Sequence, residues 1–341
     1  MSPPSDDVFF YIPDEPNLDA LDLLDPDRHW QVMRRGQRWV LQTYLRLRQA
    51  GYPVRLTGRP PDEGTLVYHR KHQKALKKQL NGHYDVTLLG IRGDRKECYL
   101  AHFEVVQNGR WADERQRFYI PYWPQPGLLP RDPSRGTSMR RITFKGFDLN
   151  LHPYFFSDEW RAWLEDHDME WVHHSIPHGP SESQGVGVDW HDYREIDAVL
   201  ALRPPPKKPH GRRGHTEKPA SKLLNAWHAG VPAILGPEYA YRELRQSEVD
   251  YLEISTPEEA RAAVLRLRHE PDLYHAMAEN GRRRAVEFGA ERILTQWSEL
   301  LFRRVPHLAA ERPRRGGSSL PHSLRFQLSI LQRLLDRRPA R

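Results

Sequence analysis

Cysteine is almost absent from this chain, which has one, Cys98, among 341 residues. A single thiol excludes an internal disulfide, and a zinc site would need His, Asp or Glu ligands. Long apolar runs are also absent, because no stretch reaches the ~18 consecutive apolar residues of a membrane-spanning helix. The N-terminal stretch MSPPSDDVFFYIPDE lacks the basic segment and long apolar core of a signal peptide. We therefore expect a cytoplasmic protein.

The chain carries 52 Lys and Arg residues against 45 Asp and Glu, a net charge of +7. A basic balance of this kind suggests a polyanionic partner. From residue 303 to 341, however, ten arginines stand against two acids, which gives this tail +8 and leaves residues 1–302 at −1. The body is therefore neutral. Because no aromatic platform interleaves the tail arginines, we expect no nucleic-acid partner.

The end of the chain has a pattern of its own. A linker-like stretch over residues 306–319 precedes leucines at helical spacing. These leucines share one side of the predicted helix: Leu320, Leu324, Leu328, Leu331 and Leu335. A basic amphipathic helix is typical of a membrane-surface or partner-docking element, which here would be peripheral contact with the inner membrane face. A tail that packs back on the body, or a disordered terminus, fits the pattern equally well.

Strand-like and helix-like segments alternate along the body, which indicates βαβ units and parallel sheets. Predicted strands cover residues 8–12, 54–57, 65–69, 85–91, 141–144, 170–173, 197–202, 232–235 and 251–254, and predicted helices cover residues 36–49, 71–80, 158–167, 220–229, 239–245, 258–269, 273–288 and 290–304. Five prolines mark residues 121–135 as a linker. We predict an α/β protein with domains over residues 1–135 and 136–305, a ligand cleft between them, and the tail 306–341.

Cations gather where such a fold binds ligands, beyond the carboxyl ends of its strands. The predicted strand 197–202 ends at Arg203, and a basic loop leads from there to Lys218 and Pro219 at the start of a helix. Proline suits the first helical turn, whose free N–H groups and positive dipole end attract phosphate. Neither G-x-x-x-x-G-K-S/T nor G-x-G-x-x-G occurs as a competing phosphate loop. We therefore expect Arg203, Lys218 and Lys222 to neutralise a diphosphate.

The segment EKPASKLLNAWHAGVPAILGPEYAYRE, residues 217–243, resembles the donor-binding segment of glycosyltransferases with the GT-B fold. Those enzymes share a Glu-x7-Glu motif followed by an A-x-x-x-G-x-P-x-I/V turn from helix to strand. Ala226, Gly230, Pro232 and Ile234 match that turn without gaps. The order of elements along the body agrees more loosely. The resemblance implies two Rossmann-like domains that face a cleft, with a C-terminal helical extension.

The same resemblance implies roles for single residues. Glu217 falls on the first motif glutamate, which lies near the donor sugar, and Asn225 replaces the second, usually a ribose contact. A neutral amide is a weaker partner for a hydroxyl than a carboxylate, which puts ribose binding by Asn225 in doubt. Glu243 matches a glutamate that often follows the turn, and Glu238 is a further substrate-binding candidate. The family's two cations on the departing nucleoside diphosphate are matched by Arg203 with Lys218 or Lys222.

Glycosyl transfer also needs an acceptor and, where the stereochemistry inverts, a base for the acceptor hydroxyl. The resemblance places both in the N-terminal domain. Gly36 and Gln37, which open a predicted helix, are candidates to approach the sugar closely. His69, at the end of a predicted strand, and His102 are candidates for the base, and each is as readily a structural histidine. Retaining and inverting chemistry both stay open.

Two Asp-x-Asp pairs, at residues 25–27 and 166–168, match a motif that holds a divalent metal in a different glycosyltransferase fold. Two such pairs are expected by chance in a chain this rich in acids. His173, His174 and His178 lack the helical i, i+4 pair with a nearby glutamate that binds zinc. We expect no essential metal and no cofactor, with a nucleotide-diphosphate sugar as co-substrate.

Together these features favour a glycosyltransferase of the hexosyltransferase class, which moves a sugar from a nucleotide-diphosphate donor to a glycan, lipid or small-molecule acceptor. A nucleotide-sugar epimerase would share the fold and need no acceptor. A non-catalytic module that holds an anionic membrane or polymer with the basic tail is the third hypothesis.

Overall fold

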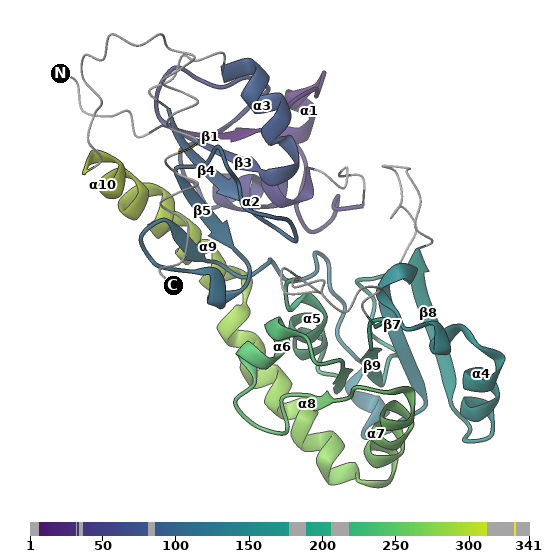
Figure 1. Cartoon of the computed structure of the whole chain (residues 1–341). Coiled ribbons are helices and arrows are strands. Elements are labelled where there is room, and N and C mark those ends of the chain that lie inside the picture. The colour runs from purple at the N-terminus through teal and green to yellow at the C-terminus, as the bar shows by residue number, and fades with distance from the viewer. Residues whose placement is uncertain are drawn as a thin grey trace. The chain divides into compact units, whose positions relative to one another are not determined.

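The structure, a computed structural model, describes residues 7–31, 33, 37–80, 86–176, 189–205, 218–311 and 331. The chain divides into two compact units, the first formed by Met1–Pro121 with Glu291–Arg341 and the second by Tyr122–Ala290 (Figure 1). Each unit contains one parallel sheet with helices. The predicted α/β class with two alternating sets of elements is therefore confirmed. The predicted cleft between them stays a prediction.

The first sheet has six parallel strands in the order β2-β1-β3-β4-β5-β6. Its strands are β1 (Val8–Tyr11), β2 (Val54–Thr57), β3 (Thr65–His69), β4 (Thr87–Ile91), β5 (Phe103–Val106) and β6 (Arg117–Tyr119). Every residue of β3 is buried, as expected of a central parallel strand covered on both faces. The strand order reverses between β1 and β3, and open α/β sheets bind ligands at such a position.

The helices of the first unit come from both ends of the chain. They are α1 (Leu18–Asp22), α2 (Arg38–Gln49), α3 (Gln73–Leu80), most of α9 (Ala290–Glu299), the π-helical turn η7 (Leu300–Arg304) and α10 (Val305–Ala310). Phe302 stacks on Tyr52 with ring centroids 5.3 Å apart, and Arg304 lies 2.9 Å from Glu114. These contacts attach the C-terminal helices to the first unit, whereas the sequence predicts residues 290–304 as the end of the second domain.

The second sheet has five parallel strands in the order β11-β10-β9-β7-β8. Its strands are β7 (Arg141–Phe147), β8 (Glu170–Ile176), β9 (Ala198–Ala201), β10 (Ala233–Leu235) and β11 (Leu252–Glu253), and its helices are α4 (Asp158–Glu165), α5 (Ser221–Ala229), α6 (Tyr239–Leu244), α7 (Pro257–His269) and α8 (Pro271–Ala285). The strand order reverses between β7 and β9. Phosphate and sugar ligands of such sheets bind at the carboxyl ends of these two strands.

The predicted turn between α5 and β10 is present. Gly230 follows α5 with φ +68°, a left-handed conformation that favours glycine. Its N–H donates to the carbonyl of Trp227 at 3.0 Å, and the N–H of Val231 donates to that of Ala226, also at 3.0 Å. The turn returns the chain directly into the sheet, so that α5 begins beside the carboxyl ends of the strands.

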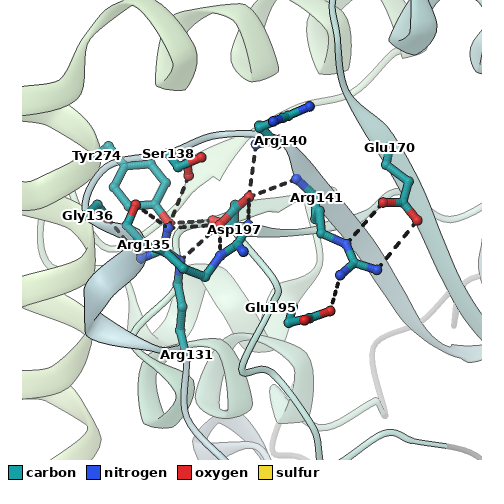
Figure 2. A network of polar contacts seen from close by, with 10 residues as sticks. All are labelled: Arg131, Arg135, Gly136, Ser138, Arg140, Arg141, Glu170, Glu195, Asp197 and Tyr274. Atoms are coloured by element: carbon teal, nitrogen blue, oxygen red, sulfur yellow. Dashed lines mark hydrogen bonds and ion pairs between the residues drawn. The ribbon is translucent and has the colours of Figure 1, made fainter.

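The proline-rich segment predicted as a linker packs instead on the second unit (Figure 2). Arg131 and Arg135 each place an Nη2 atom against the buried carboxylate of Asp197, at 2.8 and 2.9 Å. The backbone N–H groups of Arg140 and Arg141 donate to the same carboxylate at 2.9 and 2.8 Å. One buried anion thus holds the segment, and the division between units falls at 121/122 rather than at the predicted 135/136.

Candidate functional site

Three loops meet at the carboxyl ends of β7, β9 and β10, where the second sheet reverses its strand order. Each contributes one polar side chain: Asn150 from the turn after β7, Arg203 from the residues after β9, and Glu238 from the loop before α6. Arg203 Nε lies 2.8 Å from Glu238 Oε1, and Arg203 Nη1 donates to Asn150 Oδ1. The side chains of Arg203 and Glu238 are 9% and 6% exposed. The guanidinium is therefore held from two sides at the ligand edge of the sheet.

Lys222 lies beside this pair, in the first turn of α5. Its Nζ stands 5.2 Å from the centroid of the Phe144 ring on β7. Desolvation, with the nearby charge of Arg203, lowers the pKa of Lys222 from its ordinary 10.5 to about 7, against a smaller opposite effect of Glu238. We call Asn150, Arg203, Lys218, Lys222 and Glu238 the carboxyl-edge cluster.

The N-terminus of α5 adds backbone donors to the cluster. Its N-cap residue is Ala220, whose side chain has no group that could accept a hydrogen bond from the first helical turn. Lys218, two residues before this cap, is partly exposed. Free N–H groups and the positive end of the helix dipole favour an anion at this place. Two or three cations and a helix N-terminus thus share one edge of the sheet, which is the chemistry of a phosphate site.

Among the remaining residues predicted to contact the sugar or the ribose, some lie on α5 and α6 and others lie outside the described residues. Glu217 and Gly36 lie outside the described residues. The Oδ1 atom of Asn225 accepts a hydrogen bond from the backbone N–H of Gln125 at 3.0 Å, which ties α5 to the proline-rich segment. Glu243 is exposed on α6. The roles of these residues toward a sugar or ribose stay predictions.

In the first unit, Gln37 is the N-cap residue of α2 and is buried. Its Nε2 donates to Glu15 at 3.0 Å, so the amide is already part of the protein's own hydrogen bonding. His102 contacts the neighbouring strand β4 through Leu88. Its ring Nδ1 accepts a hydrogen bond from the backbone N–H of Leu88 at 2.9 Å, and its backbone N–H donates to the Leu88 carbonyl at 2.8 Å. These contacts hold β4 against the start of β5, and the role of His102 as a base stays a prediction.

His69 is different, because its ring nitrogens have no hydrogen-bond partner among the residues that the structure describes. It ends β3, beside the reversal of strand order, and its side chain is 3% exposed. The ring stacks on Trp39 at 5.9 Å with an interplanar angle of 7°. Gly93, at φ +63°, approaches so closely that a Cβ there would lie 2.9 Å from Nε2. Burial, with the charge of His72, lowers the pKa of His69 to about 3.

The buried His69 makes the stability of the first unit sensitive to mild acid. Its folded pKa of about 3 lies below the ordinary 6.5, so the unfolded chain binds the proton first and stability falls as the pH drops below 6.5. We expect His69→Phe, which keeps the stack on Trp39, to remove about 2 kcal/mol of the loss between pH 6.5 and 5. Urea unfolding at both pH values measures this. An unchanged loss of stability in His69→Phe would contradict this expectation.

Sequence reasoning missed Asn150 and the pairing of Glu238 with Arg203. Asn150 and Glu238 each follow a predicted strand, and this is the only signal that the sequence offers for them. That they meet at Arg203 depends on which strands are neighbours in the sheet, which the sequence pattern does not specify.

No group of three or more His, Cys, Asp or Glu able to hold a metal occurs within the described ranges. Asp25 instead accepts the backbone N–H groups of Asp27 and Arg28, both at 2.8 Å. In the same ranges no helix is long and apolar enough to cross a membrane.

No protein-family model and no curated protein matches this sequence. Solved structures resemble its fold. Sucrose-phosphate synthase from Thermosynechococcus elongatus matches with a TM-score of 0.55 and 13% identity, over 86% of this chain and 98% of that one. The Anabaena protein HepE in complex with UDP-glucose gives 0.51 and 14%, over 86% and 99%. The pneumococcal O-GlcNAc transferase GtfA in complex with UDP and GlcNAc gives 0.50 and 11%, over 79% and 60%.

At these identities the likeness concerns the fold alone. The chain has an α/β fold with two Rossmann-like domains, the GT-B fold of its structural neighbours.

Proposed function

We propose that this protein is a glycosyltransferase that takes a sugar from a nucleotide-diphosphate donor and binds the donor's diphosphate at the carboxyl-edge cluster. The observation that carries the proposal is the meeting of Arg203, Lys222 and the uncapped start of α5 where the second sheet reverses its strand order. Cations and helix N–H groups at such a position suit a diphosphate. Two solved structures of this fold contain UDP or UDP-glucose, which supports the proposal.

The cluster would act on the leaving group. When the bond between the anomeric carbon and the diphosphate oxygen breaks, that oxygen gains negative charge. The guanidinium of Arg203, held by Glu238 and Asn150, would face this charge without having to reorient. Lys222 and the N–H groups of α5 would share it. On this proposal the leaving diphosphate is neutralised by protein groups without a metal.

The acceptor hydroxyl must attack the anomeric carbon and lose its proton. Of the two candidate bases, His69 fits better, because His102 already accepts a backbone hydrogen bond through Nδ1. Burial lowers the pKa of His69 to about 3 in the protein without ligand, so on this proposal the negative charge of the bound donor must raise that pKa before the imidazole takes the acceptor proton. Glu217 is proposed at the donor sugar. The acceptor is proposed to be a glycan, lipid or small molecule, and both stereochemical outcomes stay within the proposal.

A thermal-shift screen across UDP-, GDP- and ADP-sugars tests this function. A ligand at 100 times its Kd adds about 2.7 kcal/mol to the free energy of unfolding and raises the melting temperature measurably. Product analysis follows with the stabilising donor. Conversion of the donor sugar to its epimer without an acceptor would favour an epimerase instead. If no nucleotide sugar stabilises the protein, the proposal is wrong.

The basic tail is proposed to place the enzyme at an anionic membrane surface. Most of residues 306–341 lie outside the described residues, so this proposal rests on the leucine and arginine pattern. Sedimentation with anionic lipid vesicles, before and after deletion of residues 312–341, tests it. The deletion should abolish sedimentation with vesicles and leave nucleotide binding unchanged.

A further inference from the structure

The charges around Lys222 include more cations than carboxylates. Three charged side chains face its amine: Arg203 from the end of β9, Lys218 from the segment before α5, and Glu238 from the loop before α6. From β7 it meets only an aromatic ring and a glycine, Phe144 and Gly146. The single carboxylate, Glu238, already forms its ion pair with Arg203 at 2.8 Å. No carboxylate within the described residues forms an ion pair with Lys222.

Gly146 shows how closely the amine is enclosed. A Cβ added at this glycine would lie 3.4 Å from Lys222 Nζ, so the amine stands against the backbone of β7. Lys222 as a whole is half-buried, and the loss of water around its amine disfavours the ammonium, as does repulsion by Arg203 and Lys218. Both effects favour the neutral amine in the protein without a ligand, and the face of the Phe144 ring offsets them only in part.

A bound diphosphate would reverse this balance. It brings two or three negative charges to a place where the described residues include no carboxylate free to pair with Lys222, and an opposite charge at contact distance favours the charged form of a lysine. The amine would then return to the ammonium form, with three N–H donors for phosphate oxygens.

We propose that binding of a nucleoside diphosphate to this protein takes up one proton from solution, and that the proton is bound by the Nζ of Lys222. The inference rests on the proposed function. Lys222 is neutral in a large share of the free protein at neutral pH and is an ammonium in the complex. The proton comes from the buffer, and release of the nucleotide returns it.

Two quantitative results follow. With Lys222 at a pKa of about 7 in the free protein, about nine tenths of the molecules carry the neutral amine at pH 8. Binding at pH 8 should therefore take up about 0.9 proton per nucleotide. Between pH 7 and 9 the affinity should fall about 50-fold, because a growing share of the protein must first bind a proton.

Calorimetric titration with UDP, GDP and ADP at pH 8 tests the inference. The binding enthalpy is measured in buffers of low and high ionisation enthalpy and plotted against that ionisation enthalpy. The slope of the line gives the number of protons taken up per nucleotide bound. The nucleotide does not contribute, since its terminal phosphate, with a pKa of about 6, is already ionised. We expect a slope near 0.9 for the wild-type protein. Lys222→Arg, which is always charged, and Lys222→Met, which is never charged, should both give slopes near zero.

Arg242→Ala is the control, because this cation on α6 pairs with Glu253 at 2.6 Å outside the carboxyl-edge cluster and its loss should keep the wild-type slope. Circular dichroism confirms that each variant is folded, and the wild-type slope alone decides the matter if a variant is not. Binding with no proton uptake, or uptake that persists in Lys222→Met, overturns the inference and leaves the proposed function standing. Failure of all three nucleotides to bind overturns both.

Discussion

Asp197→Ala is expected to lower the free energy of unfolding of the second unit by about 3–5 kcal/mol. The Asp197 side chain is 0% exposed and forms ion pairs with Arg131 and Arg135. Removing it would leave the Arg131 guanidinium, itself 7% exposed, without a counter-charge, and would free two backbone N–H groups (Figure 2). Urea unfolding followed by tryptophan fluorescence measures the change.

Asp192→Ala is the control for Asp197. This carboxylate lies nearby in sequence but is more exposed, and it pairs with the exposed Arg194 at 2.7 Å. An exposed pair contributes about 0–1 kcal/mol, so the variant should unfold near the wild-type midpoint. Equal effects of the two substitutions would show that the buried network does not hold the proline-rich segment in place.

The Asp197 network also predicts acid sensitivity. Burial raises the pKa of Asp197, but the hydrogen bonds from Arg135 and from the backbone of Arg141 and Arg140 outweigh it, so the pKa lies below its ordinary value. A carboxylate whose pKa is lowered by folding stabilises the protein fully at pH values above the unfolded pKa of about 3.9. This stabilisation is lost as the pH falls toward the lower pKa of the folded state. Asp197→Ala should therefore show a weaker loss of stability below pH 4 than the wild-type protein.

Arg203→Ala is expected to weaken nucleoside diphosphate binding about 30- to 100-fold. A charge-assisted contact from a fixed guanidinium to phosphate contributes about 2–3 kcal/mol, and each 1.4 kcal/mol is a factor of ten in Kd. Isothermal titration with the nucleotide that gives the largest thermal shift measures the loss. Arg203→Lys keeps the charge without the planar fork and should lose less than Arg203→Ala.

Controls separate binding from folding at this site. Arg203→Ala leaves Glu238 buried without its partner, so the double variant Arg203→Ala, Glu238→Gln removes both charges and restores neutrality. It should fold and still bind weakly. Arg242→Ala, on α6 but paired with Glu253 outside the cluster, should bind like the wild-type protein. Normal affinity in the folded double variant would remove Arg203 from the binding site.

Local sequence patterns were sufficient for the elements and for part of the site. Short apolar runs between helix-length segments predicted β1 to β4 and all five strands of the second sheet, because buried parallel strands need continuous apolar residues. The strands β5 (Phe103–Val106) and β6 (Arg117–Tyr119) were not predicted. The glycine and proline of the α5 to β10 turn also act locally, and Gly230 takes the expected left-handed conformation. Arg203 and Lys218 were predicted at the ligand edge from their places at a strand end and a helix start, and Lys222 was predicted to converge with them.

The ion pairs between residues far apart in the chain could not be predicted from the sequence. Arg131 and Asp197 lie 66 residues apart, and nothing near either residue indicates the other. Five prolines therefore predicted a linker where the structure has a docked segment. Glu238 likewise pairs with Arg203 because β9 and β10 are neighbours in the sheet, a contact that the sequence did not predict, while its role toward a substrate stays a prediction. Pairing of this kind follows from strand order, which local periodicity does not specify.

The central claim is that the carboxyl-edge cluster binds the diphosphate of a nucleotide-sugar donor. A crystal structure of the protein with the nucleoside diphosphate chosen by the thermal-shift screen tests this most directly. We expect both phosphates within hydrogen-bond distance of the Arg203 guanidinium or of the first N–H groups of α5, with Lys222 Nζ against a phosphate oxygen. A nucleotide bound elsewhere on either unit, with Arg203 still paired only to Glu238 and Asn150, would contradict it.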